Sequence, residues 1–102
     1  MHQNSTIPML TDRKLQNVKP LRYARKILDG RGLYLLVVPN GGRYWRYNYR
    51  FNGKQKTLAR GTYPDVSLAK ARARHEVARR QLAARFDPAA QKQAVERAVE
   101  AL

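Results

Sequence analysis

The chain contains no cysteine, no long apolar run, and very few acidic residues in its central part. Without cysteine it can form neither a disulfide framework nor a thiolate metal site. The longest apolar run, Leu33–Val38, is far shorter than the ~20 residues of a membrane-spanning helix. The start of the chain also lacks the charged-then-apolar pattern of a secretion signal. These absences lead us to expect a cytoplasmic protein with no membrane partner and no metal or other cofactor.

The charge of the chain is strongly positive and unevenly distributed. Its 102 residues, enough for one domain with a modest core, carry 21 Lys and Arg against 7 Asp and Glu, a formal net charge of +14. Residues 43–86 hold twelve of these cations and only two acids, whereas residues 87–102 hold two cations and three acids. Such a basic central region predicts a polyanionic partner that docks there.

The aromatic-rich segment 44–51 predicts the central strand of the fold. With the two-residue period of a strand, its odd-numbered residues point to one side and its even-numbered residues to the other. Asn52-Gly53 follows, a dipeptide suited to a two-residue hairpin turn, which would pair residues 51 with 54, 50 with 55, 48 with 57 and 47 with 58. That register gathers five polar, non-acidic side chains on one face: Arg46, Asn48, Arg50, Gln55 and Thr57. Guanidinium, amide and hydroxyl groups read base edges and hold phosphates, so the face predicts a DNA-reading sheet.

The flanking patterns predict an α+β fold. We expect a short helix over residues 12–18, strands over 33–38, 44–51 and 54–59, and a possible short extra strand over 24–28. This three-stranded antiparallel sheet would pack on one long C-terminal helix that begins after Ser67. The apolar stripe of that helix would comprise Leu68, Ala71, His75, Ala78, Leu82 and Phe86. Residues 1–9 would be a disordered extension, 10–87 the domain, and 88–102 a linker or the start of a following domain.

The order of these motifs resembles a known family. The segments that carry the resemblance are Leu10-Thr11-Asp12, Lys19-Pro20, Asp29-x-x-Gly32-Leu33, Trp45-x-Tyr47-x-Tyr49-Arg50, Asn52-Gly53-Lys54, Gly61-x-Tyr63-Pro64, Ser67-Leu68-x-x-Ala71-Arg72 and Asp87-Pro88. Over about residues 10–90 the chain resembles the N-terminal arm-binding domain of phage and prophage tyrosine recombinases, of the satellite-phage integrase type. Each motif alone is weak, but their combination and order are specific.

The resemblance implies sequence-specific binding of double-stranded DNA. The open face of the sheet would enter the major groove at arm-type sites that flank the recombination core. Partners would then include other integrase protomers, through domains outside this chain, and an excisionase or host architectural proteins. The expected DNA-binding residues are Tyr34, Leu36, Tyr44, Arg46, Asn48, Arg50, Lys54, Gln55 and Thr57.

The individual side chains refine this expectation. Lys54 is expected to hold a phosphate, and Tyr34 and Tyr44, on the basic face, to contact backbone or bases. The sequence departs from the family pattern at three positions: Leu36 replaces a long basic or polar residue, Arg60 an apolar residue, and Arg85 a glycine. Leu36 could contact a thymine methyl group instead.

Catalysis is not expected from this chain itself. Its internal histidine, His75, lies on the apolar helix stripe and is not followed by the His-x-x-Arg spacing that tyrosine recombinases use. The acidic residues lie beside turns and caps and form no pair for acid–base chemistry. The full-length parent would be a recombinase whose catalytic domain lies elsewhere.

Two other functions agree with the basic composition. A stand-alone RNA-binding or regulatory module would need exposed aromatic rings for base stacking, but Trp45, Tyr47 and Tyr49 are expected in the core. A protein drawn to anionic membrane surfaces would need bulky apolar residues along an exposed helix face. Binding competition among duplex DNA, single-stranded RNA and anionic vesicles separates the three functions.

Overall fold

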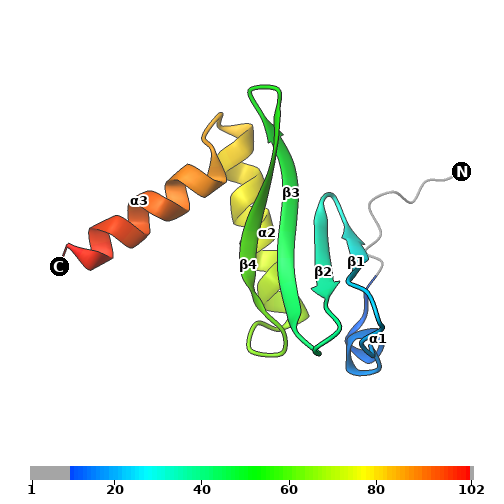
Figure 1. Cartoon of the computed structure of the whole chain (residues 1–102). Coiled ribbons are helices and arrows are strands. Elements are labelled where there is room, and N and C mark those ends of the chain that lie inside the picture. Colours follow the sequence, from blue (N-terminus) through cyan, green and yellow to red (C-terminus); the bar gives the residue numbers. More distant parts are fainter. Residues whose placement is uncertain (1–9, 102) are drawn as a thin grey trace, which may run out of the picture.

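A computed structural model describes residues 10–101, so the extension predicted over residues 1–9 lies outside the described part. The elements follow in the order α1 (Asp12–Gln16), β1 (Arg25–Gly30), β2 (Leu33–Val37), β3 (Arg43–Phe51), β4 (Lys54–Thr62), α2 (Leu68–Ala83) and α3 (Pro88–Glu100) (Figure 1). The α+β class is confirmed. The possible extra strand is a full member of the sheet, which has four strands in the described residues.

The four strands form an antiparallel sheet in the order β1-β2-β3-β4. At the β3–β4 turn, Asn52 and Gly53 have φ angles of 52° and 77°, the two positive values that a type I′ hairpin turn requires. The pairing runs from Phe51 opposite Lys54 through Arg50 opposite Gln55 and on along both strands. All four predicted residue pairs are therefore confirmed.

Strand β4 is longer than predicted because a β-bulge lets it continue. Arg46 lies opposite Ala59, but Tyr44 lies opposite Thr62, so β4 has two residues where β3 has only Trp45. A bulge of this kind increases the local twist of a sheet without ending the pairing. The strand consequently ends at Thr62 instead of Ala59.

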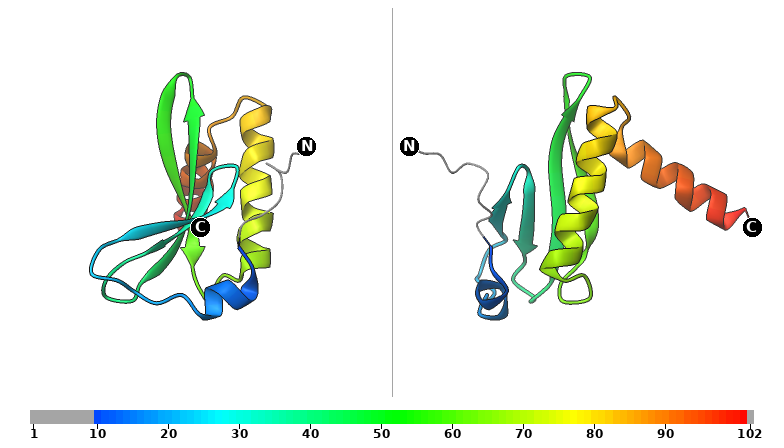
Figure 2. Two further views of the ribbon diagram at one scale, coloured as in Figure 1. Left: turned by 90° about the vertical axis from the view of Figure 1, so that its right-hand side faces the viewer. Right: turned by 180° about the vertical axis from the view of Figure 1, so that it is seen from behind.

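Helix α2 covers one face of the sheet, as the side and rear views show (Figure 2). Ser67 caps the helix, since its hydroxyl accepts a hydrogen bond from the backbone N–H of Lys70 at 3.2 Å. Two of the residues that α2 buries are alanines, Ala71 and Ala78, whose small side chains let the helix approach a sheet covered with large rings.

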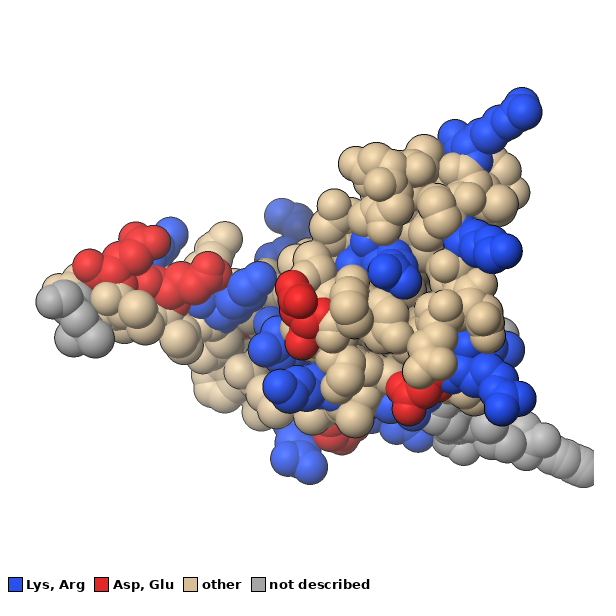
Figure 3. All heavy atoms as spheres, turned by 90° about the horizontal axis from the view of Figure 1, so that it is seen from below, with Lys and Arg blue, Asp and Glu red and all other residues tan. Residues whose placement is uncertain are grey.

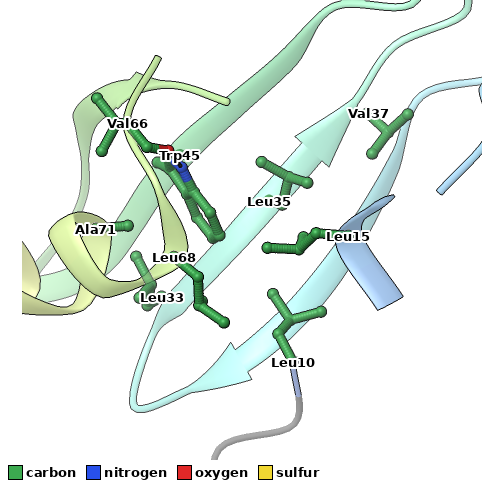
Figure 4. Close-up of a cluster of buried hydrophobic side chains, with 9 residues drawn as sticks. All are labelled: Leu10, Leu15, Leu33, Leu35, Val37, Trp45, Val66, Leu68 and Ala71. Carbon is green, nitrogen blue, oxygen red and sulfur yellow. Dashed lines mark hydrogen bonds between the residues drawn. The ribbon is translucent and has the colours of Figure 1, made fainter. Parts of the chain in front are cut away.

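The main hydrophobic core lies between this face of the sheet, α2 and α1. Trp45 is fully buried there, and its indole N–H donates to the Val66 carbonyl oxygen at 2.8 Å. Leu15 brings α1 into the same core, so both helices cover one side of the sheet. The converging side chains are Leu10, Leu15, Leu33, Leu35, Val37, Trp45, Val66, Leu68 and Ala71 (Figure 4).

The carboxylate of Asp87 connects the sheet to the start of the last helix. Asp87 caps α3 by accepting a hydrogen bond from the Ala89 N–H at 3.0 Å. The same carboxylate accepts hydrogen bonds from the Tyr49 hydroxyl and the Lys56 ammonium, which come from β3 and β4. Beyond this attachment, α3 projects away from the body of the molecule (Figure 1).

The predicted end of the long helix is wrong. Four of the six predicted stripe residues are buried on α2, but Phe86 lies beyond the helix and is 54% exposed. The cause is Arg85, which has a φ of 68°, in the left-handed region that favours glycine. The backbone turns there, so α2 ends at Ala83, before Phe86 could join its stripe.

Candidate nucleic-acid interface

The face of the sheet opposite α2 is covered by no helix or strand of residues 10–101 (Figure 2). We call it the open face. The strand register places side chains of all four strands on it: Lys26, Leu28, Tyr34, Leu36, Tyr44, Arg46, Asn48, Arg50, Gln55, Thr57, Ala59 and Thr62. The face thus combines basic, amide, hydroxyl and apolar groups, and it contains no acid.

The two arginines of β3 differ in how they are held. Arg46 is half-buried, and its guanidinium carbon lies 5.7 Å from the centroid of the Tyr44 ring, a cation–π distance. Its Nε–H is buried and has no hydrogen-bond partner within the described residues. Arg50 is exposed near the hairpin tip, where it donates to the Gly53 carbonyl oxygen at 3.3 Å. Among residues 10–101, no carboxylate is bound to either guanidinium.

All ion pairs within the described residues lie away from the open face. Lys56 pairs with Asp87 on the helix side, Arg72 of α2 pairs with Asp29, and Glu76 of α2 pairs with arginines of its own helix. Seen from below, Asp and Glu side chains gather on the projecting part at the left, and Lys and Arg are spread over the body together with further acidic groups (Figure 3). The cations of the open face are therefore free to bind an anion.

Asn48 lies at the centre of a small hydrogen-bond network on this face. Its side-chain oxygen accepts from the Tyr34 hydroxyl at 3.2 Å and from the Thr57 hydroxyl at 2.8 Å. Tyr34 is only 5% exposed, although it belongs to the open face, because its neighbours cover the ring. Little of Tyr34 is therefore available for its predicted contact with DNA, whereas Tyr44 is only half-buried.

Two residues change the predicted composition of the site. Lys54 pairs with Phe51, so by strand alternation it belongs to the helix side, at the hairpin tip, apart from the other candidates. Lys26 was not predicted, yet it lies opposite Leu36 with its ammonium 5.0 Å from the centroid of the Tyr34 ring. If residues 25–30 are taken as a strand, the alternation of side-chain direction along it could have placed Lys26 on the open face.

Leu36, Gln55 and Thr57 lie on the open face as predicted. Leu36 pairs with Tyr44, so it forms an apolar area beside the basic groups. Gln55 is exposed opposite Arg50, and Thr57 is exposed opposite Asn48. A shallow hollow lies between these rows, lined by Asn48, Tyr49, Arg50 and Gln55.

The clearest pKa shifts of acidic and histidine groups belong to the helix side. Burial, followed by its hydrogen bond to Asp87, raises the pKa of Tyr49 to about 12. Burial opposes ionisation of Asp87, but hydrogen bonds from Lys56, Tyr49 and a backbone N–H outweigh it and lower the pKa of the carboxyl. Burial also lowers the pKa of His75, whose Nε2–H donates to the Arg31 carbonyl oxygen at 3.0 Å. These groups hold the fold together and do not face the open side.

Residues 10–101 contain no group of three His, Cys, Asp or Glu side chains placed to hold a metal ion. No helix among them is long and apolar enough to cross a bilayer. The side chains of the open face offer hydrogen bonding, charge attraction and apolar contact.

Comparison with known proteins connects this surface to a function. The arm DNA-binding domain family matches residues 10–95, which include all four described strands, the whole of α2 and most of α3. The chain belongs to this family. The family resemblance predicted from the motif order is confirmed.

Several curated relatives are integrases. The chain is 41% identical over 81 residues to the integrase of Enterobacteria phage P4, covering 78% of this chain and 18% of the relative. It is 37% identical over 86 residues to the integrase of Shigella phage Sf6, covering 84% of this chain and 22% of the relative. The putative protein IntB of Escherichia coli K12 is 55% identical over 56 residues, covering 55% of this chain and 14% of the relative. This arm DNA-binding domain therefore spans less than a quarter of these relatives.

Proposed function

We propose that this domain binds double-stranded DNA sequence-specifically by inserting its open face into the major groove at arm-type recombination sites. The observation that carries the proposal is a pair of arginines, Arg46 and Arg50, which lie four residues apart on the open face of β3 and pair with no carboxylate within residues 10–101. Arginine binds the O6 and N7 acceptors of guanine in a bidentate manner, the commonest specific contact in the major groove. Arg46 is the more buried of the two, and its guanidinium lies over the Tyr44 ring.

The shape of the sheet suits the groove. The major groove of B-DNA is about 12 Å wide and admits a two-stranded β-ribbon. The β3–β4 hairpin is such a ribbon, with Asn48, Gln55 and Thr57 between and beside the arginines on its open face. Lys26 lies on the edge strand β1 and Lys54 at the hairpin tip on the helix side, and from these outer positions each would reach a phosphate.

We further propose that the parent protein is a tyrosine recombinase of the integrase type. The support is that the relatives named above are integrases, and this chain matches only a small part of each. The catalytic residues would lie in another domain. Residues 10–87 would form the DNA-binding domain and residues 88–102 the connection to a following domain. Other integrase protomers, an excisionase and host architectural proteins would be partners of the cytoplasmic parent.

The decisive experiment measures affinity for a cognate arm site and for random duplex DNA. Arg46→Ala and Arg50→Ala should each cost about 1–3 kcal/mol on the cognate site and much less on random DNA. Arg80→Ala is the matched control, because Arg80 lies on α2 with its side chain 77% exposed, away from the open face. Equal losses on both DNAs would make the two arginines phosphate contacts and remove the claim of base reading.

Salt dependence and competition test the class of ligand. With ~6 phosphate contacts, affinity for duplex DNA should fall roughly 10³-fold between 50 and 200 mM salt. Trp45, Tyr47 and Tyr49 are buried, so the strand offers few of the stacking rings that single-stranded RNA requires. Duplex DNA should therefore outcompete single-stranded RNA and anionic vesicles. Stronger binding to either competitor would refute the proposed function.

A further inference from the structure

The carboxamide oxygen of Asn48 is fully occupied by neighbouring side chains. It accepts one hydrogen bond from the Tyr34 hydroxyl at 3.2 Å and another from the Thr57 hydroxyl at 2.8 Å. A carboxamide oxygen has two lone pairs, so both acceptor positions are in use. Within residues 10–101, by contrast, no acceptor pairs with the side-chain NH₂ group of Asn48. This NH₂ group is the part of the carboxamide that remains available to a ligand.

The two hydroxyls hold the carboxamide from opposite sides. Tyr34 comes from β2 and Thr57 from β4, and Asn48 lies between them on β3. Tyr34 has little freedom to move away, because its side chain is buried and the Lys26 ammonium lies over its ring. The Asn48 backbone is fixed as well, since its N–H donates to the Gly32 carbonyl oxygen at 2.9 Å. Both the position and the rotation of the carboxamide are therefore constrained.

We propose that Tyr34 and Thr57 make Asn48 a donor-only reader of bases. It would select a base edge that offers acceptors without a neighbouring donor, either guanine N7 and O6 or thymine O4. The usual contact of asparagine with adenine needs both its oxygen and its nitrogen, one for the N6 amino group and one for N7. With its oxygen occupied, Asn48 cannot make that contact. Tyr34 and Thr57 are positioning residues that disfavour adenine, because its N6 amino group then finds no acceptor on Asn48, and this inference rests on the proposed DNA-binding function.

The test is selection of binding sites from random duplexes, followed by affinity measurements on single-base variants of the selected site. Asn48→Ala identifies the base position that Asn48 reads, because only that preference should disappear. At this position the wild-type chain should bind guanine or thymine about tenfold better than adenine. Guanine and thymine duplexes measured separately show which acceptor is used. Thr57→Val, and more fully Thr57→Val with Tyr34→Phe, should reduce the discrimination against adenine to below about threefold.

Matched variants separate positioning from a general loss of structure. Thr57→Ser keeps the hydroxyl and should keep the wild-type base preference, whereas Thr57→Val keeps the shape and should lose it. Tyr23→Phe removes a hydroxyl from a tyrosine that is 63% exposed outside the sheet, and it should change nothing. Thr57 is exposed, so its valine variant should fold and the test does not depend on the Tyr34 variant.

Three results would overturn the inference. The first is a wild-type preference for adenine at the Asn48-dependent position, which would mean that the oxygen faces the DNA. The second is an unchanged profile for the double variant, and the third is an Asn48→Ala profile identical to wild type. A chain that binds no duplex specifically would instead refute the proposed function itself, so the two failures are distinguishable.

Discussion

Replacing Arg72 by methionine should destabilise the domain more than replacing any other partly exposed Lys or Arg. Arg72 donates from Nε to one oxygen of Asp29 at 3.0 Å and from a terminal nitrogen to the other at 2.8 Å. The same terminal nitrogen donates to the Leu10 carbonyl oxygen at 2.8 Å, and the Leu10 N–H donates to Asp29 at 3.2 Å. One side chain thus connects α2, β1 and the segment before α1.

The expected magnitude follows from burial. The Asp29 side chain is 6% exposed, so removal of Arg72 leaves a buried carboxylate without its cation. Breaking a fully buried ion pair costs about 3–5 kcal/mol. The Arg72 side chain is 37% exposed, so water can replace part of what it provides. We therefore expect a loss of about 2–3 kcal/mol in the free energy of unfolding, which lowers Tm by roughly 10–20 °C for a domain of this size.

Urea denaturation and thermal unfolding measure this loss. Arg80→Met is the control, because Arg80 reaches Glu76 only at 4.0 Å on an exposed helix surface and should contribute less than about 0.5 kcal/mol. Adding Asp29→Asn to Arg72→Met removes the stranded charge and should recover part of the loss. The reasoning is refuted if Arg72→Met is as stable as Arg80→Met, or if the two changes at the buried pair are simply additive.

Three further perturbations test the packing around the sheet. Gly32→Ala should cost about 2–4 kcal/mol in urea denaturation, because a Cβ there would lie 2.3 Å from a backbone oxygen of β3 at a φ of 90°. Gly41→Ala, at a similar φ but in open space, should cost less. Burial lowers the pKa of His75 below its ordinary 6.5, so the contribution of neutral His75 to folding stability is complete above pH 6.5 and is lost as pH falls towards the folded pKa. His75→Gln should therefore make the free energy of unfolding less dependent on pH between 7.5 and 5. Asp87→Ala removes the cap of α3 and should cost about 1–2 kcal/mol, with faster amide exchange in the first turn of that helix.

Sequence patterns predicted the hairpin closely because its determinants are local. Asn52-Gly53 fixes the turn, the turn fixes the register, and alternation along β3 then assigns every side chain to a face. Trp45, with its indole N–H satisfied by a backbone carbonyl, is buried as expected. The open-face positions of Arg46 and Arg50 follow from the same parity.

The features that were missed depend on residues far apart in sequence or, at Arg85, on a backbone conformation that the side chain present does not reveal. Asp29 and Arg72 are 43 positions apart, so no local pattern reveals their ion pair. Arg85 adopts a left-handed φ that its side chain does not favour, and the predicted helix end was wrong for that reason. The Asn48 network likewise needs Tyr34, on the preceding strand β2, and could be recognised only once the β2–β3 register was known.

The distribution of the acids links stability to binding. A formal net charge of +14 opposes a compact state, because the cations repel one another. Asp29 and Asp87 relieve this repulsion at buried points on the helix side, where each joins a helix to the sheet. No acid of the described residues lies on the open face, so Arg46 and Arg50 have no carboxylate partner there. Phosphates that approach this face would neutralise the remaining cations, and any ligand that binds only the folded state stabilises it. Bound DNA should therefore stabilise the folded state by reducing the repulsion between cations, as the two buried carboxylates do, but from the opposite side of the sheet.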